Sequence, residues 1–442
     1  MTRPCILSFF ENKYQMELKK ECFGNYPFEK TLKEYKSLFL SKLDSVKEFG
    51  VEFNCSKCQK EGCLLKEQDQ NVKERVYTYL NTFLFNLKSK QNLIADYFEK
   101  IIKIYIIAIS ENRSGAMKQM EMYINNYCHH FFASGTLFFI KPFFRVRKKG
   151  NYDASDIHEL YHIPFNRRYY IGNQRFSLSG IPLLYVAESL QIALKETDCN
   201  IKNANVALFL PKYSENYKKG IYDVTNSIED SLKMDVKYII EGCEGSYTNN
   251  HINDIIARYV MSQILHFPVQ EDHKGTFIQE YVLPQLLMDI VNIKPWVGII
   301  YQSSKSNYKK CDKHNMFVDR NICFKVPMVD KNYNEDLLET FYYATWKQGE
   351  RVIKYSEYKE KYSELLVLKD IALKQGYNIN DYIMYMVQIK LHIEKMCEIL
   401  GKRTYYRRKD CRIELTLFYK ILLQIEPIFK NPKKYGLMSD IV

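Results

Sequence analysis

The sequence predicts an α+β protein in which a mixed sheet in the middle of the chain is flanked by helical elements on both sides. Between positions 136 and 326, short apolar or β-branched runs divided by turns alternate with amphipathic helical patterns. Before and after that stretch, apolar residues recur at three- and four-residue spacing, which is typical of one face of a helix. At 442 residues the chain is also long enough for a catalytic-sized core with accessory elements.

The N-terminal segment, 1–66, is marked by its cysteines. Cys55, Cys58 and Cys63 form a Cys-x2-Cys-x4-Cys cluster in a polar stretch, and Cys22 lies upstream of it. Two thiolates separated by two residues can bind one tetrahedral zinc ion, and Cys63 with Cys22 would complete a four-sulfur site. The alternative is free thiols in a loop, because no second Cys-x2-Cys pair is present. A structural zinc at these four residues is therefore one of two open interpretations.

Three regions follow this segment. In the region 67–130, helical spacing over 72–110 predicts a helical hairpin. The region 131–330 contains expected strands at 137–140, 183–186, 206–210 and 297–301, and expected helices at 252–266 and 280–293. From 334 onward the helical spacing returns, so 331–442 is expected to be an accessory helical region.

Charge and hydrophobicity limit the location and the partners. The chain has 64 Lys and Arg against 52 Asp and Glu, a net charge of +12, but the lysines are dispersed. A solvated lysine-rich surface is favoured over a nucleic-acid tract, although nucleic acid as a partner is not excluded. The start of the sequence does not read as a signal peptide, and the apolar run at 101–109 is too short to span a membrane. A cytoplasmic protein with reduced cysteines and no membrane partner is expected.

Several short motifs in the central region occur in a characteristic order. They are Phe144-Arg145-Val146-Arg147, Gln174-Arg175-Phe176-Ser177, Gly180-Ile181-Pro182-Leu183-Leu184-Tyr185, Ala193-Leu194-Lys195-Glu196, Tyr281-Val282-Leu283-Pro284, Gly298-Ile299-Ile300-Tyr301-Gln302-Ser303-Ser304 and Asn315-Met316-Phe317. In this order they resemble the RES domain, a family of toxins related to the ADP-ribosyltransferases. The resemblance covers a little under half of the chain. Arg175-Phe176-Ser177 keeps the cation and the aromatic of the family's Arg-Trp-Asn but changes the third residue.

This resemblance implies a RES fold and cleavage of NAD⁺ between nicotinamide and ribose. The paired donors of Arg145 and Arg175 suit a phosphate or ribose oxygen. Tyr185 would stack on nicotinamide, and the carboxylate of Glu196 would offset positive charge building on the anomeric carbon. Ser303 would position ribose or phosphate by a hydrogen bond. Apart from NAD⁺, the implied partners are an antitoxin or another regulatory protein and a second copy of the chain.

Some assignments stay open within this interpretation. Arg147 competes with Arg145, and Ser304 competes with Ser303, because neighbouring residues of a strand point to opposite faces. By composition alone Tyr185 would be a core aromatic and Glu196 a solvated residue at a helix end. Water, inorganic phosphate or a protein side chain could accept the ADP-ribosyl group.

Two other functional classes fit parts of the sequence. His158-Glu159-x-x-His162 matches the zinc-protease pattern, but Pro164 indicates that the chain leaves helical geometry there. The main alternative is a nucleic-acid-binding or scaffold protein with an inactive RES-like core, in which the basic charge and the cysteine cluster carry the function. Release of nicotinamide from NAD⁺ by the purified protein would separate this alternative from an enzyme.

Overall fold

The described residues are built around one mixed sheet of eight strands. The computed structural model describes residues 4–48, 68–128, 132–133, 141–212, 220–225, 228–242, 249–270, 275, 277–303, 305 and 320–437. The strands follow the order β1 (Phe132–Ala133), β5 (Ile221–Asp223), β6 (Gly298–Gln302), β7 (Arg320–Lys325), β3 (Leu183–Ala187), β2 (Phe143–Lys148), β4 (Ala204–Pro211) and β8 (Phe341–Trp346). Among these described strands, β5 and β6 pair in parallel and all other neighbours are antiparallel. The expected α+β class with a mixed sheet is confirmed.

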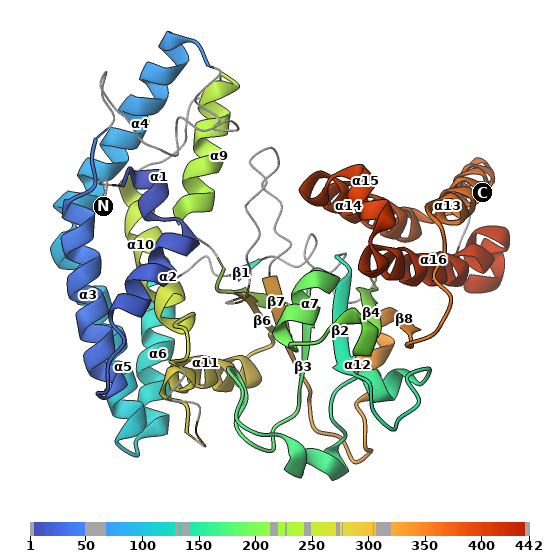
Figure 1. Ribbon diagram of the computed structural model, residues 1–442, viewed down its shortest axis with the longest axis horizontal. Coiled ribbons are helices and arrows are strands. Elements are labelled where there is room, and N and C mark those ends of the chain that lie inside the picture. The colour runs from blue at the N-terminus through green and yellow to red at the C-terminus, as the bar shows by residue number, and fades with distance from the viewer. Residues whose placement is uncertain are drawn as a thin grey trace.

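A large helical layer packs at the β5, β6 and β7 end of the sheet (Figure 1). Its helices are α1 (Ile6–Phe9), α2 (Asn12–Glu21), α3 (Phe28–Asp44), α4 (Gln70–Ser89), α5 (Gln91–Ile109), α6 (Arg113–Tyr127), α9 (Ile228–Ile240), α10 (Asn249–Leu265) and α11 (Val282–Ile293). They share one hydrophobic core, in which the ring of Phe267 lies 5.2 Å from Phe28 and 5.5 Å from Tyr35. Helices from both sides of position 130 therefore form one body, here called the N-terminal layer.

A second helical assembly packs against the other end of the sheet (Figure 1). It consists of α13 (Tyr355–Lys374), α14 (Asn380–Leu400), α15 (Lys402–Arg407) and α16 (Lys409–Lys430), called the C-terminal bundle below. The bundle shares a core with β2, β4, β8 and the short helix α7 (Leu190–Glu196), including the fully buried Trp346. The remaining elements are α12 (Glu335–Glu339) and the 3-10 turns η1 (Ile157–Leu160), η2 (Phe165–Tyr170), η3 (Ile201–Asn203), η5 (Gln279–Tyr281) and η6 (Pro432–Tyr435).

Most expected elements are present where the chain is described. The helical hairpin is α4 and α5, and the strands at 183–186, 206–210 and 297–301 are β3, β4 and β6. The strand expected at 137–140 lies outside the described residues. One element differs from expectation: the stretch after 330 was expected to be helical, but β8 forms there and pairs with β4 along six residues. Its alternating Phe, Tyr, Ala and Trp side chains suit a strand that covers a hydrophobic edge.

None of the helices in the described part of the chain is sufficiently long and apolar to cross a bilayer. The most apolar of the long N-terminal helices, α5, instead buries one side in the N-terminal layer through Ile94, Phe98, Ile101 and Tyr105. Its hydrophobic character is therefore explained by packing within the protein.

Candidate active site

A cavity of 1210 Å³ lies where the sheet meets the N-terminal layer. It is lined by residues of β2, β3, β6 and β7, by the end of α7, by the turn around 173–175 and by α2. Four of the five residues singled out from the motifs line it: Arg145, Arg175, Tyr185 and Glu196. The cavity is larger than the roughly 300–1,000 Å³ of common small-molecule pockets, so it has room for an extended ligand such as a dinucleotide.

Glu196 reaches the cavity because α7 ends there. The helix begins at Ser189, whose side chain accepts a hydrogen bond from the amide of Ile192, and its buried side holds it against the sheet. At its end, Glu196 Oε1 accepts hydrogen bonds from Ser303 Oγ at 2.5 Å and from Asn321 Nδ2 at 2.7 Å. None of the described residues donates to Oε2. The carboxylate is thus fixed through one oxygen while the other remains available to a ligand.

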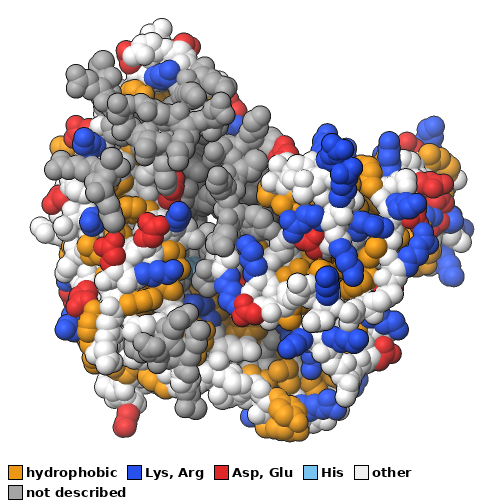
Figure 2. Space-filling model, viewed as in Figure 1, with side chains coloured by type: hydrophobic (Ala, Val, Ile, Leu, Met, Phe, Trp, Pro, Cys, Tyr) orange, Lys and Arg blue, Asp and Glu red, His pale blue; other side chains and the backbone are white. Residues whose placement is uncertain are grey.

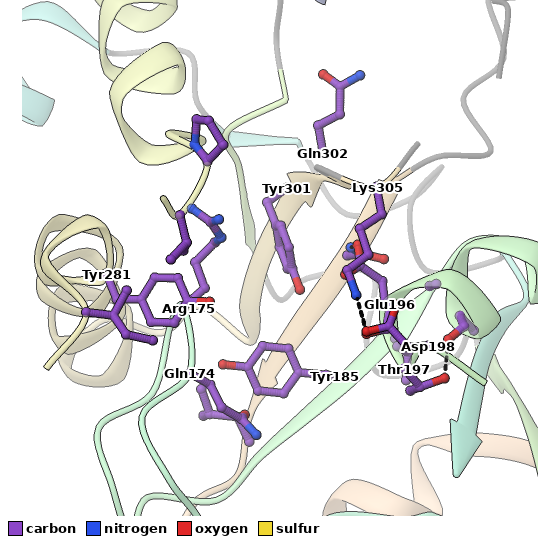
Figure 3. Close-up of a pocket in the computed structure, with 18 of the residues that line it drawn as sticks. Gln174, Arg175, Tyr185, Glu196, Thr197, Asp198, Tyr281, Tyr301, Gln302 and Lys305 are labelled. Atoms are coloured by element: carbon purple, nitrogen blue, oxygen red, sulfur yellow. Dashed lines mark hydrogen bonds and ion pairs between the residues drawn. The ribbon is translucent and has the colours of Figure 1, made fainter. Parts of the chain in front are cut away.

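Ser303 and Lys305 complete the surroundings of this carboxylate. Ser303 is 1% exposed and follows the end of β6, so it contacts the cavity through Glu196 rather than by lining it. Lys305 Nζ donates to the main-chain oxygen of Glu196 at 3.2 Å and to Asp198 at 2.9 Å (Figure 3). The competing Ser304 lies outside the described residues. The serine expected from the motif therefore stands next to the expected glutamate.

Arg145 lies beneath the cavity with its charge unpaired by any carboxylate of the described residues. Its Nη1 donates to the main-chain oxygen of Tyr185 at 2.8 Å, while its buried Nε has no hydrogen-bond partner. Burial, with a smaller contribution from Arg147, lowers the pKa of Arg145 to about 10, so it is a cation at neutral pH. Arg147, two residues further along β2, pairs with Glu159 at 3.2 Å and does not line the cavity. Of the two arginines, the geometry therefore favours Arg145 as the residue that faces the cavity.

Arg175 projects from a turn that α11 holds in place. Gln285 of α11 donates to the main-chain oxygens of Gln174 and Ser177 at 3.0 and 3.2 Å. Arg175 Nη1 donates to the main-chain oxygens of Leu265 and Phe267, both at 3.1 Å, and its guanidinium lies 5.1 Å from the ring centre of Tyr281. These contacts orient the cation but do not neutralise it, so it can attract an anionic group.

Tyr185 combines features of a core residue and of a binding residue. Its hydroxyl accepts a hydrogen bond from the amide of Phe176 at 3.3 Å and lies 3.4 Å from Ser177 Oγ. Burial raises the pKa of Tyr185 well above its usual value, and burial does the same for Tyr301. Both side chains line the cavity, and in Figure 3 their rings are drawn between Arg175 and Glu196. Tyr185 therefore presents a neutral aromatic side chain.

Several residues near the cavity were not anticipated from the sequence. Asn321 of β7 is one, and it donates a hydrogen bond to Glu196. The feature of the sequence that could have indicated it is the polar pair Arg320-Asn321 at the start of an otherwise apolar strand. Met16 and Lys20 come from α2 and Phe23 from the turn after it, and nothing in the sequence indicated that this segment reaches the site. Long-range packing of the N-terminal layer places them there.

Two buried bases lie behind Arg175. Lys19 is fully buried and its ammonium group makes no hydrogen bond. Burial, followed by the charge of Arg175, lowers its pKa well below the usual value. His266 donates from Nδ1 to the main-chain oxygen of Ser262 at 2.7 Å and accepts at Nε2 from the amide of Gln302 at 3.1 Å. Burial, Lys19 and Arg175 lower the pKa of His266 to about 3, so it is neutral at physiological pH.

The two other glutamates near the motifs are engaged elsewhere. Glu188 is 3% exposed and accepts hydrogen bonds from Arg320 at 2.7 and 3.2 Å. Burial opposes its ionisation, but Arg320 and Lys141 outweigh burial and keep the pKa of Glu188 below the usual value. Glu159 pairs with Arg147. Glu196 is the glutamate that lines the cavity.

Within the described residues, no group of three or more His, Cys, Asp or Glu side chains is placed to hold a metal ion. Cys22 is buried, its thiol donates to the main-chain oxygen of Leu18, and burial raises its pKa to about 12, so a proton would have to be lost before it could bind zinc. Cys55, Cys58 and Cys63 lie outside the described residues, and the zinc site stays a prediction. The ring of His158 forms hydrogen bonds with Asp156 and Glu335, whereas the ring of His162 accepts one from the amide of Asn334. His158 lies in η1 but His162 does not, so the two histidines do not share the helix that the zinc-protease pattern requires.

Comparison with known proteins finds a relative described as a toxin. The chain is similar to a protein of Bacillus subtilis (strain 168) named "Putative toxin YopC", with 25% identity over 181 residues. The match covers 40% of this chain and 39% of the Bacillus protein, so the chain spans about two fifths of that relative's length. No protein-family model matches the chain. No solved structure matches it either.

Proposed function

We propose that this protein is a RES-like toxin or defence effector that cleaves the bond between nicotinamide and ribose in NAD⁺. The observation that carries the proposal is the arrangement of charge in the cavity. Glu196 is held by Ser303 and Asn321, while Arg145 and Arg175 line the same cavity and form no ion pair with a carboxylate of the described residues. Both side chains are partly shielded from solvent, and charges in such places without a counter-charge are costly, so they are commonly kept where a ligand supplies it.

The ligand that fits this arrangement is anionic in its middle and cationic at one end. The two guanidinium groups suit the pyrophosphate or ribose oxygens. Tyr185 and Tyr301 are neutral aromatic side chains that can contact a nicotinamide ring. As the bond to nicotinamide lengthens, positive charge builds on the ribose, and the free Oε2 of Glu196 is available to offset it or to bind a ribose hydroxyl.

The biological setting of this proposal comes from the relative named as a toxin. Consumption of NAD⁺ arrests cells, so such an enzyme needs control by an antitoxin or another regulatory protein. Water, inorganic phosphate or a protein side chain would accept the ADP-ribosyl group, and access to the cavity would decide among them. A second copy of the chain is a further candidate partner.

The test is incubation of the purified full-length protein with NAD⁺, with and without inorganic phosphate. We expect nicotinamide to appear, and the partner product to identify the acceptor: ADP-ribose for water, its phosphorylated form for phosphate, and a mass increase of protein for a side chain. Growth and cellular NAD⁺ should be measured on expression in parallel. If nicotinamide is not released and cellular NAD⁺ does not fall, the proposal is wrong.

A further inference from the structure

A dense group of cations covers one part of the C-terminal bundle. Six of the eleven residues from 402 to 412 are Lys or Arg, and one is acidic. Five of these cations are exposed and form what we call the α15 surface: Lys402, Arg403, Arg407, Arg408 and Lys409. Figure 2 shows Lys and Arg side chains gathered over the C-terminal helices. Elsewhere the lysines of this sequence are dispersed, so this segment differs from the general basic excess.

The charge of this surface is largely uncompensated. Within the described residues, Lys402, Arg403 and Arg407 form no ion pair with a carboxylate. Arg408 pairs with Asp410 at 2.5 Å, and Lys409 lies 5.9 Å from the ring centre of Trp346. Because so little acid balances these cations, a positive potential faces the solvent here.

The cations also stand on a rigid support. Between them in the sequence, Tyr405 is fully buried and Tyr406 stacks on Tyr355 at 4.1 Å between ring centres. The carboxylate of Glu414, itself fully buried, accepts a hydrogen bond from the hydroxyl of Tyr405 at 3.4 Å. A fixed backbone lowers the conformational entropy lost when the side chains engage a ligand.

We propose that the α15 surface binds nucleic acid through its phosphate backbone, independently of base sequence. Several adjacent cations match the repeated phosphates of a nucleic acid, whose binding is driven by the release of counterions. A membrane surface fits less well, because membrane-binding segments combine cations with exposed apolar residues and no large hydrophobic residue from 402 to 412 is exposed. The same lack leaves this surface without the exposed aromatic anchors that fill pockets at many protein interfaces.

The experiment uses the full-length protein with a fluorescent 20-nucleotide RNA and a 20-base-pair DNA duplex. Anisotropy is measured between 50 and 200 mM salt. We expect the triple variant Lys402→Glu, Arg403→Glu, Arg407→Glu to bind at least tenfold more weakly. If all three contact phosphates of the duplex, the slope of log affinity against log salt should shrink by about 2.7. This readout does not depend on NAD⁺ cleavage.

A matched control carries the same change of charge on the N-terminal layer: Lys33→Glu, Lys103→Glu, Lys118→Glu. These lysines are exposed and have no ion-pair partner among the described residues. The control should retain wild-type affinity. Equal weakening in both triple variants would show that the overall charge, and not this surface, attracts nucleic acid. The proposal is also overturned if the wild-type protein binds neither probe at 50 mM salt, or if only anionic vesicles compete for the surface.

Discussion

The N-terminal layer and the C-terminal bundle both pack on the same sheet, but they serve the cavity in different ways. The N-terminal layer supplies part of its wall directly, through α2 and through residues 268–270, which follow α10. Leu265 at the end of α10 also accepts a hydrogen bond from Arg175. The C-terminal bundle contributes none of the lining residues. It contacts α7 instead: Glu414 accepts a hydrogen bond from the amide of Leu190, and Asp410 accepts one from Gln191.

The N-terminal layer therefore shapes the cavity, whereas the C-terminal bundle supports a helix that carries one of its residues. The N-terminal layer can determine which ligand fits, since some of its side chains line the cavity. The bundle can affect how firmly Glu196 is held, because its hydrogen bonds to α7 are made at the first turn and Glu196 lies at the last. Substitutions in the two regions should therefore change different kinetic constants.

The largest effect is expected at Glu196, where the support from the bundle reaches the cavity. Glu196→Gln keeps the size and one acceptor oxygen but removes the charge. We expect turnover of NAD⁺ to fall by about 10² or more, with little change in melting temperature. Nicotinamide release measured beside thermal unfolding checks both statements. A variant as active as the wild type would show that another group stabilises the transition state.

The next largest effect is expected at Arg175, which the N-terminal layer orients in the cavity wall. Arg175→Ala should lower kcat/KM roughly 10- to 100-fold, with KM rising and turnover falling together, because the cation orients and attracts the substrate. Arg147→Ala is the matched control, since that guanidinium pairs with Glu159 and does not line the cavity. Similar losses in both variants would point to a general effect of charge.

A smaller effect is expected for Glu414, which we assign as a positioning residue. Glu414→Gln replaces an acceptor of the Leu190 amide with a weaker or misplaced one, so kcat should fall about tenfold while KM stays unchanged. Glu426→Gln, on the same helix, alters a pairing with Lys361 and Lys430 within the C-terminal bundle and should leave both constants unchanged. A rise in KM for Glu414→Gln would contradict the division between the two regions.

Two substitutions of Tyr185 should show whether its ring or its hydroxyl matters for activity. Tyr185→Phe loses hydrogen bonds to the Arg175 turn, which costs about 1 kcal/mol of stability, but it keeps the ring and most of the activity. Tyr185→Ala should lose activity. Kinetics and thermal unfolding are measured on both. If the Ala variant merely unfolds, the residue is a core aromatic; if a folded Phe variant is inactive, the hydroxyl binds the substrate.

The smallest effect concerns pH and stability. Burial raises the pKa of Asp235, in α9, to about 6, although the hydroxyl of Tyr79 donates to it at 2.5 Å. The folded state therefore holds this proton more tightly than the unfolded chain, and Asp235 destabilises the fold increasingly as pH rises from about 4 to 6. Asp235→Asn should raise the melting temperature by a few degrees at pH 7.5 and have no effect below pH 4.

Asp410 of the C-terminal bundle has a pKa shift in the opposite direction to that of Asp235. Burial would raise its pKa, but Arg408 outweighs burial and holds the pKa below the usual value. Its charged form is thus the stabilising one at neutral pH, and its contribution is lost as pH falls through the lowered pKa. Asp410→Asn should lower the melting temperature at pH 7.5. Shifts of the same sign for the two variants would contradict these assignments.

The sequence predicted well those features that depend on local patterns. The spacing of apolar residues located α4, α5 and β4, and the order of short motifs selected four residues that line one cavity. Periodicity misjudged β8, because its strand character depends on pairing with β4, which lies more than a hundred residues earlier. Packing between distant segments has no local signature in the sequence.

The same limit explains what was missed at the site. Lys20 and Asn321 are ordinary polar residues by composition, and only the three-dimensional arrangement brings one from α2 to the cavity wall and the other within 2.7 Å of Glu196. The choice between Arg145 and Arg147 also required the fold. Both lie on β2 two residues apart, so pattern alone treats them alike.

The contact between Glu414 and α7 also has a consequence for synthesis of the protein. A chain emerging from the ribosome makes Leu190 long before it makes Glu414, 224 positions later. At roughly 5–20 residues per second, the amide of Leu190 waits about 10–45 s for its acceptor. Until then α7 lacks its support, so an incomplete product that stops before α16 should hold Glu196 poorly. If the finished protein is harmful to its own cell, this order of assembly delays the harm until α16 has been made.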